Sequence, residues 1–316
     1  MTAFIARRLL GLLVTLAAMA ALVFWALDIL PGNAAQMALG PDAAPEAVRA
    51  LATQMGLDQP AWSRFLHWLL ALLHGDLGTS ASYGDPVSTL IAERLALTVP
   101  LALLAMLLTC VLALAVGVTA AARHRSGTDT TLMAITQIGV AVPNFWLAIL
   151  LVLLFAVKLQ WFSAGGFDGW DQGIAEGLRA LWLPAVALAA VQAAILARFT
   201  RSAVLETLRE DYVRTARAKG LSERAILWKH VLRNAAVPVV TVMGLQFAEL
   251  LAGAIVVENV FTLPGLGRLV FQAIGNRDLP LVRGCVMLLA TLVVLVNFAV
   301  DVLYAAIDPR LRGAAR

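Results

Sequence analysis

Six apolar stretches, each long enough to cross a lipid bilayer, constrain this chain more than any other feature of its sequence. A transmembrane α-helix needs about 20 predominantly apolar residues. The 316-residue chain is 61% hydrophobic and only 14% charged, which is more apolar surface than a water-soluble core of this size can bury. The sequence therefore predicts an all-α integral membrane protein with six transmembrane helices. The predicted spans are residues 9–30, 95–122, 132–157, 181–199, 236–261 and 281–307.

The first apolar stretch follows Arg7 and Arg8, as in a secretory signal, but it is too long for the apolar part of one. We therefore predict an uncleaved N-terminal span within residues 1–30. A nine-residue apolar run, residues 65–73, is too short to cross the membrane and is interrupted by His67. We expect there a helix at the membrane interface or against neighbouring spans, with a seventh span as the alternative.

Lys and Arg residues concentrate in alternate connecting segments, which predicts the topology because positively charged segments stay in the cytoplasm. Placing the N-terminus inside assigns 16 of the 24 Lys and Arg residues to the cytoplasmic side. Both termini are therefore predicted to be cytoplasmic. The 16 are Arg7, Arg8, Arg123, Arg125, Arg198, Arg201, Arg209, Arg214, Arg217, Lys219, Arg224, Lys229, Arg233, Arg310, Arg312 and Arg316.

The chain shows no internal repeat and no separate soluble domain, so we predict one transmembrane domain over residues 1–316. The long outer segment contains two stretches with helical spacing of apolar residues, Val48 to Met55 and Trp62 to Leu73, and is predicted to form a small helical cap. The predicted parts are the first span (1–30), the external cap (31–94), a five-helix core (95–307) and, within it, a cytoplasmic loop (200–235).

The strip from Glu210 to Pro238 is unusually polar for this chain and holds six basic and three acidic residues. Apolar residues recur there at helical spacing up to Ala216, Gly220 stands where a helix would end in a left-handed cap, and Ser222 can cap a second helix. We predict two short helices that meet at the glycine, with Pro238 marking entry into the membrane. The alternative is that the cations only set the topology and contact anionic lipid head groups.

Polar residues within the predicted spans are candidates for substrate passage or for bonding between helices. Glu249 lies deep in the fifth span, three residues after Gln246. It either lines a pathway or bonds to a neighbouring helix. Pro143 and Asn144 interrupt the third span, where freed backbone groups can face a cavity. Gln192 in the fourth span is an interhelical hydrogen-bond candidate.

Motifs for catalysis and nucleotide binding are missing from the sequence. There is no G-x-x-x-x-G-K-[ST] run to hold phosphates, and the four histidines lack the spacing of metal ligands. No nucleophile appears with a base at a suitable spacing. We therefore expect no enzymatic activity, no cofactor, no metal site and no nucleic-acid partner, and an energy source outside this chain.

The order of residues in the polar strip resembles a known family. The run Arg214-Thr215-Ala216-Arg217-Ala218-Lys219-Gly220, followed later by Val237-Pro238, is similar to the cytoplasmic "EAA" loop of ABC-importer permeases, in the dipeptide, oligopeptide, glutathione and nickel branch. Arg214 and Thr215 occupy places where the general pattern has Glu and Ala. Further matches to the first-subunit type of that branch are Arg7-Arg8-Leu9-Leu10, Pro31-Gly32, residues 56–60, residues 75–80, Pro86-Val87, Pro143-Asn144-Phe145, residues 258–261, residues 264–267, residues 301–304 and residues 308–310.

The resemblance implies a type I ABC-importer permease in a bacterial cytoplasmic (inner) membrane. It implies a loop helix that couples to ATPase subunits, which hydrolyse ATP while the permease alternates its access between the two sides. The implied partners are a second homologous permease subunit, two cytoplasmic ABC ATPase subunits, an external solute-binding protein and the lipid bilayer. The implied ATPase-coupling residues are Glu210, Asp211, Tyr212, Arg214, Thr215, Ala216, Arg217, Lys219 and Gly220. The candidate pathway residues are Pro143, Asn144, Gln246 and Glu249.

Two other classes compete with this interpretation. A self-contained ion-driven transporter would show several intramembrane carboxylates and paired repeats, whereas only Glu249 lies well inside a span. A membrane-embedded enzyme would need a nucleophile with its base or a metal cluster. The resemblance favours di- or oligopeptides as cargo, with glutathione, nickel chelates or other small solutes as alternatives.

Overall fold

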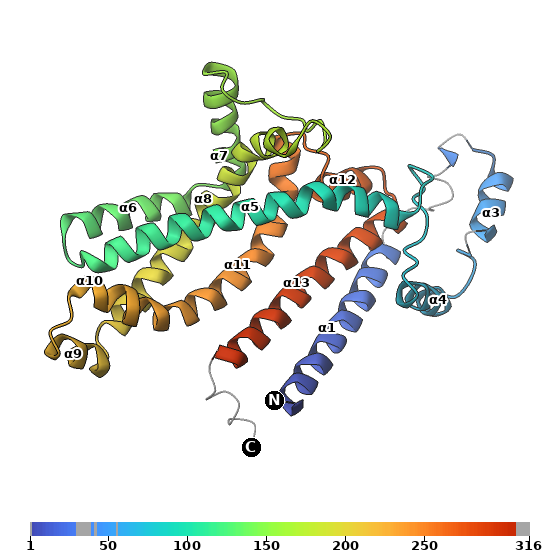
Figure 1. Cartoon of the computed structure of the whole chain (residues 1–316). Coiled ribbons are helices and arrows are strands. Elements are labelled where there is room, and N and C mark those ends of the chain that lie inside the picture. Colours follow the sequence, from blue (N-terminus) through green and yellow to red (C-terminus); the bar gives the residue numbers. More distant parts are fainter. Residues whose placement is uncertain (1, 30–38, 41–42, 55, 308–316) are drawn as a thin grey trace. The chain divides into compact units, whose positions relative to one another are not determined.

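The computed structural model describes residues 2–29, 39–40, 43–54 and 56–307, and most of this backbone is helical (Figure 1). No β-strand occurs in these ranges, where Thr79 and Pro86 form an isolated bridge. The elements are α1 (Thr2–Asp28), α3 (Pro45–Gln54), α4 (Ala61–Leu73), α5 (Val87–Ala122), α6 (Gly127–Ala141), α7 (Asn144–Leu151), the π-helical η1 (Val152–Lys158), α8 (Ile174–Thr207), α9 (Asp211–Ala218), α10 (Glu223–Ala225), the π-helical η2 (Ile226–Val231), α11 (Leu232–Val260), α12 (Leu266–Gly275) and α13 (Leu279–Ile307).

The chain forms two compact units. The first contains residues 99–263 and 296–307 together with the first described residues of α1, and the second contains residues 5–98 and 264–295. Helices α5 and α13 therefore contribute to both units. Helix α9 belongs to the first unit, as do the polar residues singled out in the predicted spans, Asn144, Gln192, Gln246 and Glu249.

Helices long and apolar enough to cross a membrane account for the predicted spans. Five pass this test alone: most of α1, then α5, α8, the continuous helix of residues 223–260 and most of α13. Helix α6 and the helix formed by α7 and η1 pass it together as a bent pair, which gives six spans if the pair is one span. The all-α, multi-span prediction is confirmed.

The third predicted span is two helices at an angle of 99° rather than one rod. Val142 has an extended backbone, with φ −84° and ψ 120°, and α7 begins directly after Pro143. Clash with the proline ring moves the preceding residue out of the helical region, and proline lacks the N–H needed to continue the helical hydrogen bonds. The predicted interruption at Pro143 and Asn144 is confirmed, and the run over residues 132–157 is corrected to two helices.

Glycines bring α5 and α6 close to α8. A Cβ on Gly117 of α5 would lie 2.6 Å from the carbonyl oxygen of Ala197, and a Cβ on Gly139 of α6 would lie 3.0 Å from the Cβ of Ala194. Small residues allow this close backbone approach between helices in a membrane. Both α5 and α6 therefore pack directly on α8.

In the second unit, α3 and α4 correspond to the two helical stretches predicted in the cap. With 13 residues, α4 is too short to cross a bilayer core about 30 Å thick. Its Phe65 meets Phe24 of α1 edge-on at 5.2 Å, and Arg64 pairs with Asp28 of α1 at 2.9 Å. The Arg283 guanidinium of α13 lies 4.6 Å above the Phe24 ring. The short apolar run is thus a helix packed against neighbouring spans.

A buried carboxylate organises the turn before α13. Asp278 accepts hydrogen bonds from the Ser80 hydroxyl and from the backbone N–H groups of Ser82 and Leu281, the last two at 2.9 and 3.2 Å. Burial raises the pKa of Asp278, but these donors together hold it below its ordinary value. The carboxylate thereby connects the loop before α5 to the start of α13.

Candidate functional site

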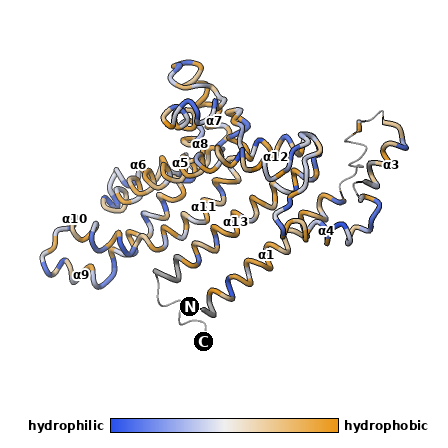
Figure 2. The backbone as a smooth tube through the Cα atoms, turned by 45° about the vertical axis from the view of Figure 1, so that its right-hand side comes forward, coloured by the Kyte–Doolittle hydropathy of each residue, from blue (hydrophilic) through white to orange (hydrophobic). Residues whose placement is uncertain are grey.

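The α9 segment, defined here as residues 208–222, connects α8 to α10 and contains the first part of the polar strip singled out from the sequence (Figures 1 and 2). Glu210 precedes the helix with an extended backbone, with φ −64° and ψ 147°. Asp211 lies in the first turn of α9 and Arg217 in its last turn, an arrangement that the helix dipole favours.

Gly220 ends α9 in the left-handed conformation, with a φ of 77°. The N–H of Leu221 donates to the carbonyl of Ala216 at 3.3 Å, and the N–H of Gly220 donates to the carbonyl of Arg217 at 2.9 Å. This pair of bonds is the Schellman motif. No atom lies within 4 Å of a Cβ built on Gly220, so the positive φ, and not lack of space, favours glycine here. The predicted glycine cap is confirmed.

One face of α9 is packed into the core of the first unit. Val213 is fully buried, Ala216 is 7% exposed, and the side-chain amide of Asn234 in α11 donates to the Tyr212 hydroxyl at 2.7 Å. The α9 segment therefore shares one apolar core with α5, α8 and α11. The other buried members of this core are Ala113, Val118, Ala121, Leu196, Ala197, Ala203, Val204, Ile226, Val231, Ala235 and Val239.

The opposite face of α9 carries charge. Arg214 Nη1 lies 3.3 Å from Asp211 Oδ1, and these side chains are 73% and 96% exposed. Arg217 binds Glu223 with two hydrogen bonds, from Nε at 2.6 Å and from Nη2 at 3.0 Å. Exposed pairs of this kind contribute only about 0.2–1 kcal/mol to stability, so the charges are available to a partner. Of the predicted coupling residues, Ala216 is buried, and the exposed ones are Glu210, Asp211, Tyr212, Arg214, Thr215, Arg217, Lys219 and Gly220.

The second arm of the strip differs from the prediction. The Ser222 hydroxyl accepts a hydrogen bond from the Ala225 N–H at 3.3 Å, which confirms the predicted cap. From Glu223 onward, however, the chain stays helical through η2 and α11 to Val260. Pro238 therefore lies inside a 38-residue helix, and its place at the entry into the membrane stays a prediction. Of the two predicted short helices, only α9 is short. The second continues into α11, because neither glycine nor proline interrupts its first turns.

Two predicted pathway residues belong to a polar network between α8 and α11. Gln192 Nε2 donates to Glu249 Oε2 at 3.1 Å, and Gln246 Nε2 donates to the Gln192 carbonyl at 3.0 Å. Gln192 and Gln246 are buried, whereas Glu249 is exposed. The predicted interhelical bonding of Gln192 is confirmed. The Glu249 side chain thus bonds to α8 and is also exposed. Its part in substrate passage stays a prediction.

The other two predicted pathway residues lie at the bend between α6 and α7. A Cβ on Gly253 of α11 would lie 3.0 Å from Nδ2 of Asn144, and Gly253 follows Glu249 by one helical turn. The bend at Pro143 therefore approaches α11 next to the polar network. Spacing along the sequence did not indicate this proximity.

A buried ion pair at the turn between α5 and α6 was missed by the sequence reasoning. Asp129, the first acidic residue of α6, receives hydrogen bonds from Arg201 of α8, from Nε at 2.6 Å and from Nη2 at 2.7 Å. The N–H of Arg125 also donates to it at 3.0 Å, and His124 Nδ1 lies 3.2 Å away. Part of this site could have been found from the sequence, because Ser126 stands three residues before Asp129, as in a helix cap. The Ser126 hydroxyl caps α6 by accepting from the Asp129 N–H.

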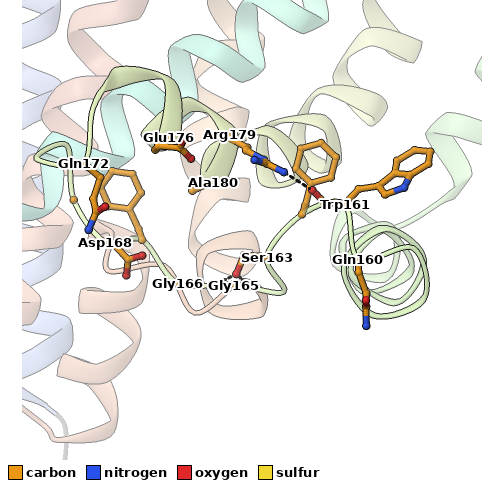
Figure 3. Close-up of a pocket in the computed structure, with 14 residues that line it drawn as sticks. Gln160, Trp161, Ser163, Gly165, Gly166, Asp168, Gln172, Glu176, Arg179 and Ala180 are labelled. Atoms are coloured by element: carbon orange, nitrogen blue, oxygen red, sulfur yellow. Dashed lines mark hydrogen bonds between the residues drawn. The ribbon is translucent and has the colours of Figure 1, made fainter.

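A cavity of about 400 Å³ lies in the segment between η1 and α8, which the charge pattern assigned to the outer side (Figure 3). Its lining combines aromatic rings with the carboxylates of Asp168 and Glu176. Arg179 Nη2 donates to the Trp161 carbonyl at 3.0 Å across it. Among the described residues, no three His, Cys, Asp or Glu side chains come together as a possible metal site.

Comparison with known proteins covers nearly the whole chain. The family "Binding-prot-dependent transport system membrane comp, N-term" matches residues 1–102, and the family "Binding-protein-dependent transport system inner membrane component" matches residues 113–313. A putative peptide transport system permease protein of Brucella abortus is 46% identical over 99% of both chains. The glutathione transport system permease protein GsiC of Salmonella choleraesuis is 43% identical over 98% of both chains.

Among solved structures, the fold is similar to that of the MetNI methionine ABC transporter in an inward-facing conformation. The TM-score is 0.58 at 22% identity, over 69% of this chain and 96% of that chain. The family matches confirm the resemblance read from the loop and its flanking motifs, and they identify a multi-pass transport component rather than an enzyme. The chain therefore belongs to the binding-protein-dependent transport system inner membrane components, the ABC-importer permeases that work with ATPase and solute-binding partners.

Proposed function

We propose that this chain is the membrane-spanning permease subunit of an ATP-driven importer and that α9 is the helix through which ATPase subunits move it. The observation that carries this proposal is the two-faced packing of α9. Its buried face, Val213 and Ala216, shares a core with α5, α8 and α11, while its opposite face is charged and exposed. Because packed cores resist deformation, a force applied to the exposed face moves those helices with it.

The exposed residues of α9 have different roles in this proposal. Tyr212 and the backbone at Gly220 give close packing against an ATPase groove, with Ala216 supporting the helix from its buried side. The charges of Glu210, Asp211, Arg214, Arg217 and Lys219 steer assembly more than they tighten it, because exposed charges mainly affect association rates. Thr215 donates its hydroxyl to the Asp211 carbonyl at 3.0 Å and stabilises the first turn.

The full transporter that we propose contains this chain, a second homologous permease, two cytoplasmic ATPases and an external solute-binding protein. The whole chain acts as one permease domain with both termini in the cytoplasm, as the distribution of Lys and Arg predicts. The solute-binding protein then docks on the cap and the outer segments, including the segment around the cavity of Figure 3. ATP hydrolysis in the partner subunits drives alternating access.

The cargo that we propose is a di- or oligopeptide or glutathione, since relatives above 40% identity carry peptide and glutathione transport names. On this proposal the polar network of Gln246 and Glu249, with the bend at Pro143 and Asn144 beside it, contributes to the route of the substrate. A peptide has many hydrogen-bonding groups, and the exposed Glu249 carboxylate and the half-buried Asn144 amide can substitute for their water.

The test is to replace Gly220 by tryptophan in the assembled transporter and to measure ATP-driven uptake and ATPase co-purification. We expect both to be lost while the chain stays in the membrane, because a bulky side chain at positive φ displaces the end of α9. Gly84→Trp is the matched control, since Gly84 also has a positive φ, of 75°, and no atom within 4 Å of a built Cβ. It should retain the ATPases. Normal uptake by Gly220→Trp would overturn the proposal.

A further inference from the structure

The proposed function leaves unassigned a bidentate ion pair in the first unit, that of Asp129 and Arg201. Their side chains are 6% and 22% exposed, and both guanidinium arms engage the carboxylate. The N–H of Arg125 satisfies the carboxylate further. Bidentate arginine–carboxylate pairs fix orientation as well as distance. The pair therefore holds the turn between α5 and α6 in a defined position on α8.

The place of this pair along α8 relates it to α9. Arg201 lies six residues before the end of α8 at Thr207. Ala203 and Val204 of the next half-turn belong to the core that holds Val213 of α9. A displacement of α9 is therefore transmitted through this core to the part of α8 next to Arg201.

Helix α5 shares an apolar core with α8 and α9, so packing already links α5 to their movement. At Gly117 of α5 and Gly139 of α6, the two helices also come close to the backbone and small side chains of α8. A bidentate ion pair adds a directional bond to this packing, which fixes the orientation of the α5–α6 turn on α8. A second polar contact, Arg198 Nη1 to Gln137 Oε1 at 2.9 Å, joins the same two helices α6 and α8 but is exposed and uses a neutral acceptor.

We propose that the Asp129–Arg201 pair is the positioning contact that makes the α5–α6 turn move with α8 and α9, so that ATPase motion produces transport. This inference rests on the proposed coupling role of α9 and adds specific residues that transmit it. Neither residue contacts cargo or nucleotide in this scheme. Both act through the position of α5 and α6.

The test measures transported cargo per ATP hydrolysed in the complete transporter, purified through this chain and reconstituted in vesicles with a tripeptide or glutathione as cargo. The variants are Asp129→Asn, Arg201→Gln and the two combined, with Arg198→Gln as the matched control on the same helices. We expect each single variant to lower cargo per ATP about fivefold or more, the size of an ordinary coupling between sites. The double variant should lose no more than either single, because each already removes the ion pair.

A merely structural role would reduce yield, ATP hydrolysis and uptake together and leave cargo per ATP unchanged in the assembled fraction. That result, or additive losses in the double variant, or an equal loss in Arg198→Gln, would overturn the inference. If a neutral variant does not assemble, Arg201→Lys is used instead, because lysine keeps the positive charge but cannot make the bidentate contact. It should give a value of cargo per ATP between those of the wild type and the neutral variants. A wild-type chain that retains no ATPase would instead contradict the proposed function.

Discussion

Two arginine–carboxylate pairs in the first unit have nearly the same geometry and different surroundings. Arg201 and Asp129 meet at 2.6 and 2.7 Å, and Arg217 and Glu223 meet at 2.6 and 3.0 Å, each through the Nε and Nη2 atoms. The first pair joins two helices and is 22% and 6% exposed, whereas the second lies within one loop and is 43% and 68% exposed.

The difference shows that surroundings, and not hydrogen-bond geometry, determine what such a pair does. Water screens the charges of the exposed pair, so it contributes little to stability and remains open to exchange with a partner. In the buried pair, loss of Arg201 leaves the Asp129 carboxylate, which is 6% exposed, with only the Arg125 N–H and His124 as partners. The α9 segment and the residue that follows it thus carry exposed charges, those of Arg217 and Glu223, that a partner can bind. The Asp129–Arg201 pair is shielded from water and keeps its partners.

The largest expected effect comes from removing one member of the buried pair. Arg201→Met should lower the free energy of unfolding by about 2–3 kcal/mol, because the Asp129 carboxylate loses two charge-assisted hydrogen bonds and keeps only the Arg125 N–H and His124. Thermal or denaturant unfolding of the detergent-solubilised chain measures this loss.

The control for this prediction is the double variant Asp129→Leu, Arg201→Met. It should recover a large part of the lost stability, since no uncompensated charge remains. A loss below about 1 kcal/mol in Arg201→Met would show that burial does not distinguish the two pairs.

An intermediate effect is expected at the glycine that lies between the two members of the exposed pair. Gly220→Ala should cost about 1 kcal/mol, because alanine resists the φ of 77° although space is available for its methyl group. Gly127→Ala is the control, since Gly127 has open space and an ordinary φ at the start of α6. Equal unfolding midpoints for the two variants would contradict this assignment of strain.

The smallest expected effect on stability is that of the exposed pair. Arg217→Gln should change the free energy of unfolding by less than about 1 kcal/mol. It should nevertheless slow association with the ATPase subunits at low salt, and the difference from wild type should vanish near 1 M salt, where charges are screened within about 3 Å. Surface plasmon resonance at two salt concentrations tests both parts. If the difference in association rate between Arg217→Gln and the wild type did not depend on salt, Arg217 would not be one of the charges that steer assembly.

Local sequence patterns predicted much of the candidate site. The left-handed end of α9 at Gly220 and the Ser222 cap are confirmed because both depend on backbone preferences of a few adjacent residues. The second arm was predicted as a short helix, and it is continuous with α11. Its end could not be placed locally, because Pro238 is accommodated inside a long helix in this protein.

Hydropathy along the chain was enough to establish a multi-span helical membrane protein, since apolar surface of this extent needs lipid around it. The sequence also located the interruption at Pro143, which follows from the geometry of one proline ring. The 99° angle of that bend, the bonding of Gln192 to Glu249 and the pair of Asp129 with Arg201 all depend on packing between helices. Asp129 and Arg201 are 72 residues apart. No local preference encodes such a distance, so these contacts exist only once α5, α6, α8 and α11 are packed together.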